Sequence, residues 1–438
     1  MENISYKKLF SLWLPLAVTW IMISAEGPFL AAVVARQVAA KYNLAAYGIA
    51  VALALLTESI VIMLLSTANF YVRSRAHYFI IRKFTITVNI IAFSFLVIII
   101  LPPVFNIFSH LMRLDEKVKE LAHISTVILL PWPVAIGFRR FYQGILIRKG
   151  HTIRVAISTV FRMFTIFTTA LTLSHFTHIQ GAIIGAISLS TGVTLEAILA
   201  KIITNSTVKN ILKDTSQNIK VPDFAEILKF YIPLALTAML GMASQTTITF
   251  FLGRAALPLE SLAVMPVVGS FSFIFASVCF AYMEIVIANC GTNFENYKKL
   301  INFAILIGFT VMFIYIAAGN TPFANFWFAY VAGLSNSTLN LSGLAIEATK
   351  ILFIMPLFAA ITSLQRGLLI LFKKSIQISF ATFLELFLII ITLNIIIYYV
   401  KIPGIYAACF SLIIARGLAC IYLSFPINHS IRLIKNKS

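Results

Sequence analysis

The sequence predicts an all-α polytopic membrane protein, with twelve transmembrane helices in two six-helix lobes that repeat in parallel orientation. Three observations support this fold class: a very apolar composition, twelve apolar runs of membrane-spanning length, and an internal sequence repeat. Of 438 residues, 60% are hydrophobic and 11% are charged, whereas soluble domains average roughly 45–50% apolar and 25% charged residues. This composition excludes a water-soluble enzyme and a disordered chain. It also excludes an outer-membrane barrel, whose strands alternate apolar and polar residues.

A transmembrane helix needs about 20 consecutive, mostly apolar residues. The runs that meet this condition lie at 9–35, 45–70, 84–106, 123–147, 155–175, 179–203, 228–253, 262–288, 300–318, 347–372, 376–399 and 402–425. The stretch 319–346 is interrupted by helix-breaking residues such as Gly319, Pro322 and Gly333. We therefore expect this stretch to form a long exposed connection between the ninth and tenth spans.

An even number of spans places both termini on the same side of the membrane. The loops on that side gather most of the basic residues, among them Lys7, Lys8, Arg82, Lys83 and Lys201. Since cytoplasmic loops are enriched in Lys and Arg, both termini are expected in the cytoplasm, with the chain in the plasma membrane or the bacterial inner membrane. The net charge of +19 then reflects topology and contact with anionic membrane lipids. No nucleic-acid partner is expected, because the charges punctuate apolar blocks and do not gather in a binding motif.

The two halves of the chain repeat each other in sequence. One match aligns Leu12–Arg36 with Phe230–Arg254, and a second match, at nearly the same spacing, sets Gly144 on Gly367 and Gly181 on Gly404. We therefore expect an N-terminal lobe over 1–203 with spans one to six, a cytoplasmic linker over 204–227, and a C-terminal lobe over 228–438 with spans seven to twelve. Because each repeat has an even number of spans, the pseudo-twofold axis runs along the membrane normal, as in rocking-bundle transporters that bind their substrate between the halves.

Several motifs together resemble one transporter superfamily. PLAxT opens the first and seventh spans, at 15–19 and 233–237, and RRxxQGxLI closes the fourth span at 139–147. With the two six-span halves, these motifs resemble the multidrug/oligosaccharidyl-lipid/polysaccharide (MOP) flippase superfamily, and within it the MATE exporters and the progressive-ankylosis-type membrane proteins. The resemblance implies a V-shaped, two-lobe transporter that exports a solute by alternating access, driven in MATE exporters by inward movement of Na⁺ or H⁺. The seventh span holds Ser244 and Gln245 but no carboxylate, which disfavours Na⁺.

Ionisable residues within the spans are functional candidates, because each costs at least ~2.5–3.5 kcal/mol at mid-bilayer. Arg162 in the fifth span and Glu385 in the eleventh are equivalent in the repeat. Glu196 in the sixth span falls one helical turn from the position equivalent to Arg416 in the twelfth. We expect Arg162 to pair with Glu196 and Glu385 with Arg416, each pair joining neighbouring helices of one lobe.

Three arginines are candidates for substrate binding. Arg139 and Arg140 lie about 24 Å along the fourth span at 1.5 Å per residue, and Arg366 takes the repeat position of Gln143. Guanidinium groups bind carboxylate or phosphate in a bidentate manner. Arg139, Arg140, Gln143 and Arg366 are therefore expected to bind an anionic group of the substrate. The alternative is that these arginines bind phospholipid headgroups or close a cytoplasmic gate.

Glu26 and Glu58 are the candidates for ion coupling. Glu26 lies in a Ser-Ala-Glu-Gly-Pro sequence at 24–28, where glycine and proline allow the first span to bend. Glu58 lies near the middle of the second span, so the two carboxylates could be neighbours that hold a proton between them. The alternative is a salt bridge from either glutamate to Arg139 or Arg140.

The remaining motifs argue against catalysis. The sequence has no Walker A run, Rossmann fingerprint, GxSxG elbow or kinase motif, and no HxH or HExxH spacing of histidines. We expect no enzyme activity, no cofactor and no metal, and we expect Cys279, Cys290, Cys409 and Cys420 to be buried core residues.

Taken together, these patterns indicate a secondary active transporter that exports a small organic solute, with an anion or an amphiphile favoured and H⁺ as the coupling ion. Two alternatives remain. The first is a flippase for a phosphate-bearing lipid or lipid-linked precursor, and the second is a non-transporting membrane partner of another protein.

Overall fold

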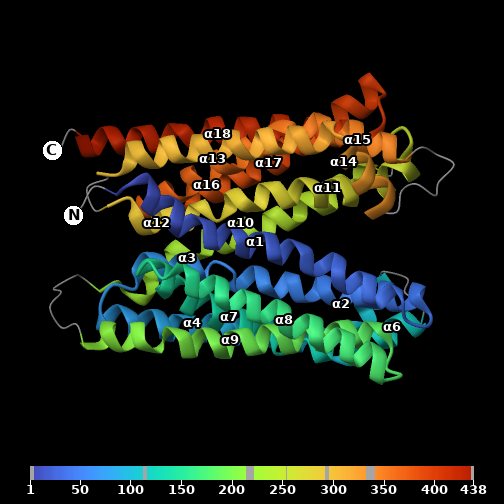
Figure 1. Cartoon of the computed structure of the whole chain (residues 1–438), viewed down its shortest axis with the longest axis horizontal. Helices are drawn as coiled ribbons and strands as arrows, with labels where there is room; N and C mark the ends of the chain where they lie inside the picture. Colours follow the sequence, from blue (N-terminus) through green and yellow to red (C-terminus); the bar gives the residue numbers. More distant parts are fainter. Residues whose placement is uncertain are drawn as a thin grey trace. The chain divides into compact units, whose positions relative to one another are not determined.

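The computed structural model describes residues 4–111, 116–213, 221–252, 254–291, 295–331 and 341–435. These residues are almost entirely helical, and the β-bridge they contain, between Ala256 and Pro403, is isolated (Figure 1). The helices are α1 Tyr6–Ala35, α2 Ala40–Val61, α3 Leu64–Tyr71, α4 Arg75–Ile100, α5 Pro102–Leu111, α6 Glu116–Ile128, α7 Trp132–Arg148, α8 Thr152–Phe176, α9 Gly181–Lys213, α10 Phe224–Leu252, α11 Pro258–Phe280, α12 Tyr282–Asn289, α13 Tyr297–Asn320, α14 Pro322–Asn325, η1 Phe326–Val331, α15 Leu341–Ile351, η3 Leu352–Ile354, α16 Met355–Leu371, α17 Ser375–Ile395, η4 Ile396–Val400 and α18 Gly404–Lys435.

The twelve predicted spans are confirmed. Twelve helical segments of the described residues are long and apolar enough to cross a membrane, and the chain is an integral membrane protein. Four of these spans consist of two helices in succession, such as α2 with α3 and α6 with α7. The third span begins at Arg75 and the sixth continues to Lys213, so both extend further than their apolar cores, as helices do when polar ends reach the interface.

Two connections differ from the sequence prediction. The expected linker 204–227 is helical at both ends, because α9 continues to Lys213 and α10 begins at Phe224. The expected exposed connection 319–346 contains the short helix α14 and the π-helical turn η1, in which Phe328 is buried. Most residues of 322–331 are exposed, as predicted, but the segment is helical, so the prediction that it lacks helix is wrong there. Residues 214–220 and 332–340 lie outside the described part.

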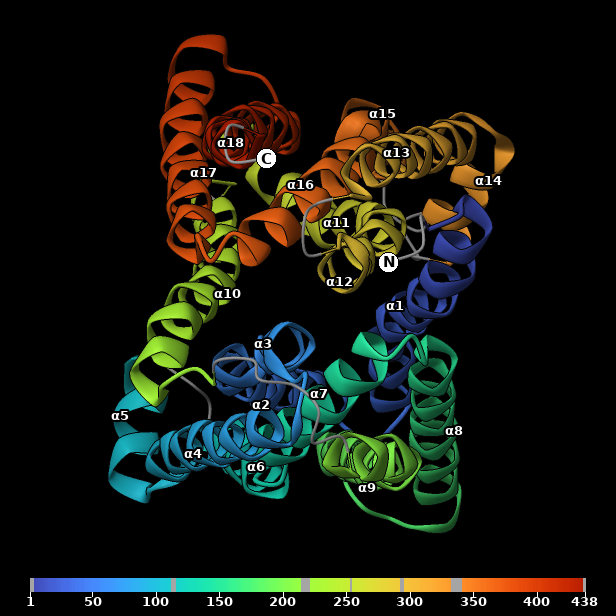
Figure 2. The same ribbon diagram turned by 90° about the vertical axis from the view of Figure 1, so that its left-hand side faces the viewer.

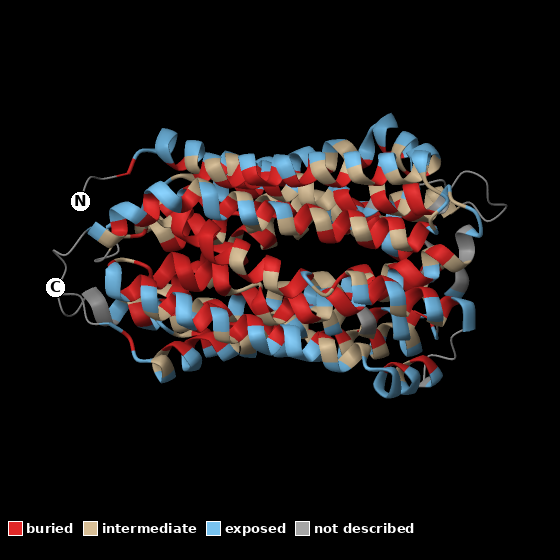
Figure 3. Cartoon of the chain, turned by 90° about the horizontal axis from the view of Figure 1, so that it is seen from below, coloured by how far each residue is buried: buried red, intermediate tan, exposed pale blue. Residues whose placement is uncertain are grey.

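The chain divides into two compact units. We call Met22–Ala235 the central unit, and Met1–Ile21 with Leu236–Ser438 the terminal unit. In the central unit, α9 packs along α7 and α8, and in the terminal unit α18 packs along α16 and α17. Figure 2 shows α8 beside α9, and α17 beside α18, seen along the helices. Figure 3 shows that the helices alternate buried with exposed residues along their length, as expected where one face of a helix packs and the other meets lipid.

The unit boundaries fall inside α1 and α10 and not in the predicted linker. In the first half of α1, Trp13 donates a hydrogen bond to the carbonyl of Val278 at 3.2 Å, whereas Glu26 in the second half pairs with Arg162. In α10, the Tyr231 hydroxyl donates to the carbonyl of Ile60. Each half of these two helices therefore packs within a different unit.

The sequence repeat is visible in the positions of the helices. The alignment that sets Pro15 on Pro233 also sets the first residue of α1 on the first residue of α10, and it sets α3 on α12 from end to end. The alignment that sets Gly144 on Gly367 matches the first residues of α7, α8 and α9 with those of α16, α17 and α18. The small shift between the two alignments arises in the connections between α3 and α7, where the second half has the additional residues.

Backbone details repeat under the same two alignments. Ala39 and Leu257 have left-handed backbones, with φ of 57° and 52°, one residue before α2 and α11. The first turn of α9 is capped by a side chain from α2: the backbone N–H of Ala182 donates a hydrogen bond to Asn43 Oδ1 at 2.8 Å. The equivalent turn of α18 has Ile405 N donating to Ser261 Oγ at 3.1 Å. Because left-handed non-glycine residues and buried caps are uncommon, their recurrence indicates a duplicated structure.

Gly144 and Gly367 allow close helix packing at equivalent places. A Cβ atom on Gly144 of α7 would lie 2.4 Å from the carbonyl oxygen of Leu65 in α3. A Cβ atom on Gly367 of α16 would lie 3.0 Å from the carbonyl oxygen of Met283 in α12. Small residues at helix contacts are the usual means of close packing in membranes.

The substitution Gly144→Ala is expected to destabilise the central unit by about 1–3 kcal/mol, because a backbone atom cannot move aside for the added methyl group. Thermal unfolding of the detergent-solubilised protein measures this effect. Gly48→Ala in α2 is the matched control, since a Cβ atom there would meet nothing within 4 Å. Equal melting temperatures for the two variants would contradict the packing argument.

Candidate functional site

A buried network of charges crosses the central unit. Arg162 Nη2 in α8 lies 2.5 Å from Glu26 Oε2 in α1, and Arg139 Nη1 in α7 lies 2.6 Å from Glu196 Oε2 in α9. None of these four side chains is more than 8% exposed. Ion pairs so far from water depend on good geometry and additional hydrogen bonds to offset the loss of hydration.

Glu196 is the most highly bonded member of this network. Its carboxylate accepts hydrogen bonds from Arg139, from Gln143 Nε2 at 3.3 Å and from Thr159 Oγ1 at 3.1 Å. Arg162 Nε is 3.6 Å from Glu196 Oε2. The predicted pair of Arg162 with Glu196 is therefore a longer contact within a larger network, in which the shortest contact of Arg162 is with Glu26.

The structure separates the residues that were expected to bind substrate. Arg139 and Gln143 are 2% and 3% exposed and both hold Glu196. Arg140, on the same helix, forms no ion pair with a described carboxylate, although Glu58 and Glu196 lie within electrostatic range. Adjacent helical residues point about 100° apart, so Arg139 can serve the network while Arg140 points elsewhere.

Glu58 has a neutral partner. Its Oε2 accepts a hydrogen bond from Trp132 Nε1 at 3.1 Å, and both side chains are buried. Among the described residues, no arginine or lysine forms an ion pair with Glu58. Glu26 and Glu58, expected as neighbouring carboxylates, thus have different hydrogen-bond partners, Arg162 and Trp132.

The buried network, taken together with Glu58 and Arg140, contains equal numbers of acidic and basic side chains. Its acids are Glu26, Glu58 and Glu196, and its bases are Arg139, Arg140 and Arg162. Two of the acids and two of the bases form ion pairs, which leaves Glu58 and Arg140 without one in the described part. Uptake of a proton would therefore give the group a net positive charge.

The helix that carries Glu26 is continuous in this structure. The sequence predicts a break at 24–28 that allows the first span to bend, and α1 is helical without interruption from Tyr6 to Ala35. The Gly-Pro sequence therefore does not interrupt the helix, because neighbouring helices can support such a sequence within a membrane span.

The terminal unit contains a simpler charge pair. Glu385 Oε1 in α17 lies 2.7 Å from Arg416 in α18, as the sequence predicts, and Arg416 is 22% exposed. Arg366 Nη2 in α16 donates a hydrogen bond to Thr382 Oγ1 at 3.3 Å. Among the described residues, Arg366 forms no ion pair, and it resembles Arg140 in this respect although its repeat position is that of Gln143.

Replacement of Glu385 by alanine is expected to destabilise the terminal unit less than loss of a fully buried carboxylate, by about 1–3 kcal/mol. Arg416 is partly exposed and can be hydrated when its partner is removed. The melting temperature of the purified variant tests this. Arg416→Ala should cost more, since it leaves Glu385 buried at 7% exposure, and the reverse order would contradict the argument.

Two partners in the network were not predicted from the sequence. Thr159 gives no sequence signal, because hydroxyl groups in membrane helices usually bond to their own backbone. Trp132 gives a weak sequence signal, because a buried indole N–H needs a hydrogen-bond acceptor and Glu58 is one of few acids in these spans. The four cysteines are buried and unpaired, and no group of potential metal ligands was found among the described residues.

Comparison with known proteins identifies the fold. No protein-family model and no curated protein matches this sequence. An outward-facing multidrug resistance MATE family transporter of the MOP superfamily superposes with a TM-score of 0.81 and 14% identity, over 98% of this chain and 96% of that chain. A Vibrio cholerae MATE transporter gives 0.77 and 15% over 97% of each chain. A MOP superfamily transporter from Pyrococcus furiosus, described by the reverse polarity of its binding pocket, gives 0.70 and 15% over 99% of this chain and all of that one.

Proposed function

We propose that this chain, which has the fold of the MATE transporters, is a secondary active transporter that exports a small organic solute by alternating access. The observation that carries the proposal is the balanced group of three carboxylates and three guanidinium groups inside one unit, in which Glu58 and Arg140 have no ion pair among the described residues. A structural role alone would be fulfilled by complete pairing, since unpaired buried charges are costly. We assign the unpaired members to transport.

The proposed coupling ion is H⁺, carried by Glu58 and Glu26. Protonation of Glu58 breaks no ion pair, because its partner is the neutral indole of Trp132. Protonation of Glu26 would release Arg162, whose Nε already lies 3.6 Å from Glu196. The released guanidinium thus has a second carboxylate to move toward, and proton binding can change how α1 is held. Na⁺ is less favoured, since α10 has no carboxylate beyond Glu226.

The proposed substrate carries an anionic group. Of the four residues expected to bind substrate, Arg140 and Arg366 form no ion pair with a described carboxylate, whereas Arg139 and Gln143 are bonded to Glu196. A guanidinium group offers a bidentate contact to carboxylate or phosphate. We therefore narrow the expected substrate-binding residues to Arg140 in the central unit and Arg366 in the terminal unit. The distribution of Lys and Arg supports cytoplasmic termini in a plasma or bacterial inner membrane.

Proteoliposomes with an acidic lumen test this proposal. Uptake of carboxyfluorescein, an organic anion, should exceed uptake of the organic cation ethidium and should cease when an ionophore collapses the pH gradient. Scrambling of a labelled anionic lipid without solute uptake would favour a flippase. Absence of both activities would favour a non-transporting membrane partner and overturn the proposal.

A further inference from the structure

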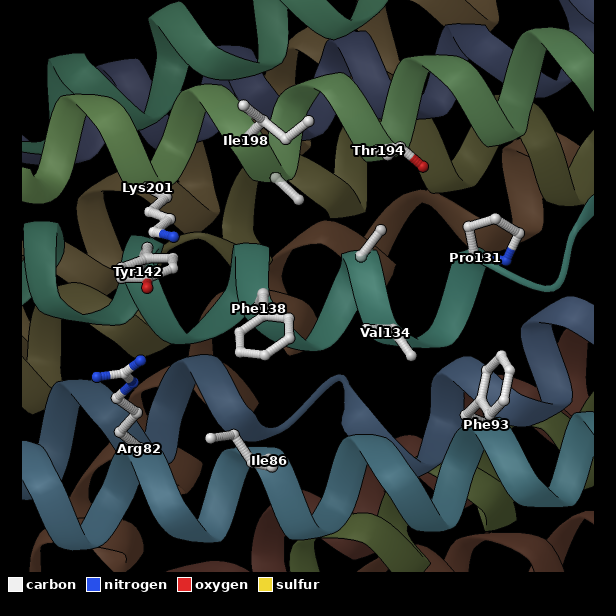
Figure 4. Close-up of a pocket in the computed structure, with 12 residues that line it drawn as sticks. Arg82, Ile86, Phe93, Pro131, Val134, Phe138, Tyr142, Thr194, Ile198 and Lys201 are labelled. Carbon is white, nitrogen blue, oxygen red and sulfur yellow. The ribbon is translucent and has the colours of Figure 1, made fainter.

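A groove in the central unit has no role in the mechanism proposed above. It lies between α4, α7 and α9, has a volume of about 460 Å³, and falls within the range of small-molecule sites. We call it the α4–α7–α9 groove. Its walls are apolar for most of their length, with Ile86, Phe93, Val134, Phe138 and Ile198 among the lining residues (Figure 4).

The polar residues of the groove gather at one end. Figure 4 shows Arg82, Tyr142 and Lys201 together, with Phe93 and Pro131 at the opposite end. Arg82 and Lys201 are exposed, and neither forms an ion pair with a described carboxylate. The groove thus combines a basic, open end with an apolar interior.

The basic end lies at one boundary of the membrane. The helix from Gly181, where α9 begins, to Lys201 is about 30 Å long, which equals the usual hydrocarbon thickness. The helix from Arg82 to Ile100, where α4 ends, is about 27 Å long. The two bases, reached from different helices, therefore lie at the same boundary.

The groove extends about as far as one leaflet is thick. Phe93 lies three turns beyond Arg82 on the same helix, a distance of about 16 Å, and half of the hydrocarbon core is about 15 Å. Ile86, Phe93 and Ile198 are 38%, 39% and 51% exposed, so the groove is open along its side. An acyl chain could enter laterally from the leaflet that meets the basic end.

We propose that the α4–α7–α9 groove binds one anionic phospholipid, with its phosphate at Arg82 and Lys201 and an acyl chain along Phe138 toward Phe93. The charge of the open end matches a phosphate, and the length and apolar walls match a chain. Basic recesses between transmembrane helices on the cytoplasmic side are suited to anionic headgroups, and the distribution of Lys and Arg predicts that this end is cytoplasmic. Because α7 also carries Arg139 and Arg140, lipid occupancy would stabilise the helix that holds the charge network.

Native mass spectrometry of the full chain tests the site. Purified protein is mixed with equal amounts of phosphatidylglycerol and phosphatidylcholine that carry the same acyl chains. Each basic residue contributes about fivefold to the affinity for an anionic lipid. The protein should therefore bind phosphatidylglycerol as its first lipid about 30-fold more often than phosphatidylcholine. The double variant R82Q/K201Q should show nearly equal binding of the two lipids.

A matched control uses bases on the same two helices that do not line the groove. The double variant K83Q/K209Q changes the net charge equally and replaces exposed residues, so it should keep the preference. Equal loss of the preference for phosphatidylglycerol in both double variants would overturn the proposal. Absence of this preference in the unmodified protein would also overturn it. The second outcome requires no variant, so the test does not depend on variant folding.

The apolar part is tested separately. Thr194→Phe with Ala197→Phe fills the groove from α9 and keeps both bases, and it should reduce binding of the lipid to the level of R82Q/K201Q. Unchanged binding would place the lipid elsewhere and overturn the assignment to the groove. Glycerol phosphate, which has the headgroup chemistry without a chain, should not displace the lipid, and displacement would indicate a site for soluble phosphates and overturn the assignment to a lipid. These results do not depend on transport activity.

Discussion

Replacement of Glu196 by alanine is expected to lower the free energy of unfolding by about 3–5 kcal/mol, because removal of one partner of a buried ion pair leaves an uncompensated charge. Glu196 accepts hydrogen bonds from Arg139, Gln143 and Thr159 and is 0% exposed. Its loss would leave Arg139 without a carboxylate in contact and give the network a net positive charge. The expected result is a large decrease in the melting temperature and in the amount of folded protein in the membrane.

Two further variants show whether this effect arises from the ion pair. The double variant Arg139→Met with Glu196→Met removes both charges and keeps side-chain volume, so it should lose less stability than Glu196→Ala alone. Glu347→Ala is the surface control, since its pair with Lys350 has exposures of 57% and 40% and such pairs contribute about 0–1 kcal/mol. A Glu196→Ala protein as stable as Glu347→Ala would show that the network does not hold the unit together.

The sequence predicts the fold of this protein in more detail than its site. The spans follow from apolar runs that any membrane helix requires, and the repeat follows from motifs that lie at helix contacts. Gly144 and Gly367 match in sequence because both allow a backbone to approach closely. The division of α1 between the two units was not predictable, because an apolar helix has no sequence mark for the bundle on which each turn packs.

The ion pairs illustrate the same limit. Glu385 and Arg416 are the acid and base of adjacent helices in the terminal unit, and they form the expected pair. In the central unit three acids and three arginines are available, and Arg162 pairs most closely with Glu26, which is far away in the chain. Helix rotation and depth decide among such partners, and neither is fixed by apolar periodicity alone. The partner of Glu58, Trp132, depends on the same rotation.

The substitution Glu58→Gln is expected to abolish uptake driven by a pH gradient while the protein remains folded. The glutamine carbonyl oxygen can still accept the hydrogen bond from Trp132 Nε1, and no ion pair is lost. The side chain can no longer take up or release a proton, however, so the gradient has no carrier at this position. In proteoliposomes with an acidic lumen, carboxyfluorescein accumulation should fall to the level of protein-free vesicles. Exchange of internal for external carboxyfluorescein without a gradient should persist, because alternating access itself is unchanged.

Comparison of Glu58→Gln with Glu26→Gln separates coupling from folding, because Glu26 is bonded differently. It is paired with Arg162 at 2.5 Å, so its neutralisation should reduce both the melting temperature and the gradient-driven uptake, whereas Glu58→Gln should reduce only the uptake. Glu116→Gln is the control, since the Glu116 side chain is 84% exposed and its partner among the described residues is Lys119 at the surface. It should change neither quantity. Full gradient-driven uptake by Glu58→Gln would exclude Glu58 as a proton carrier, and full uptake by both variants would leave the balanced charge network with a structural role alone.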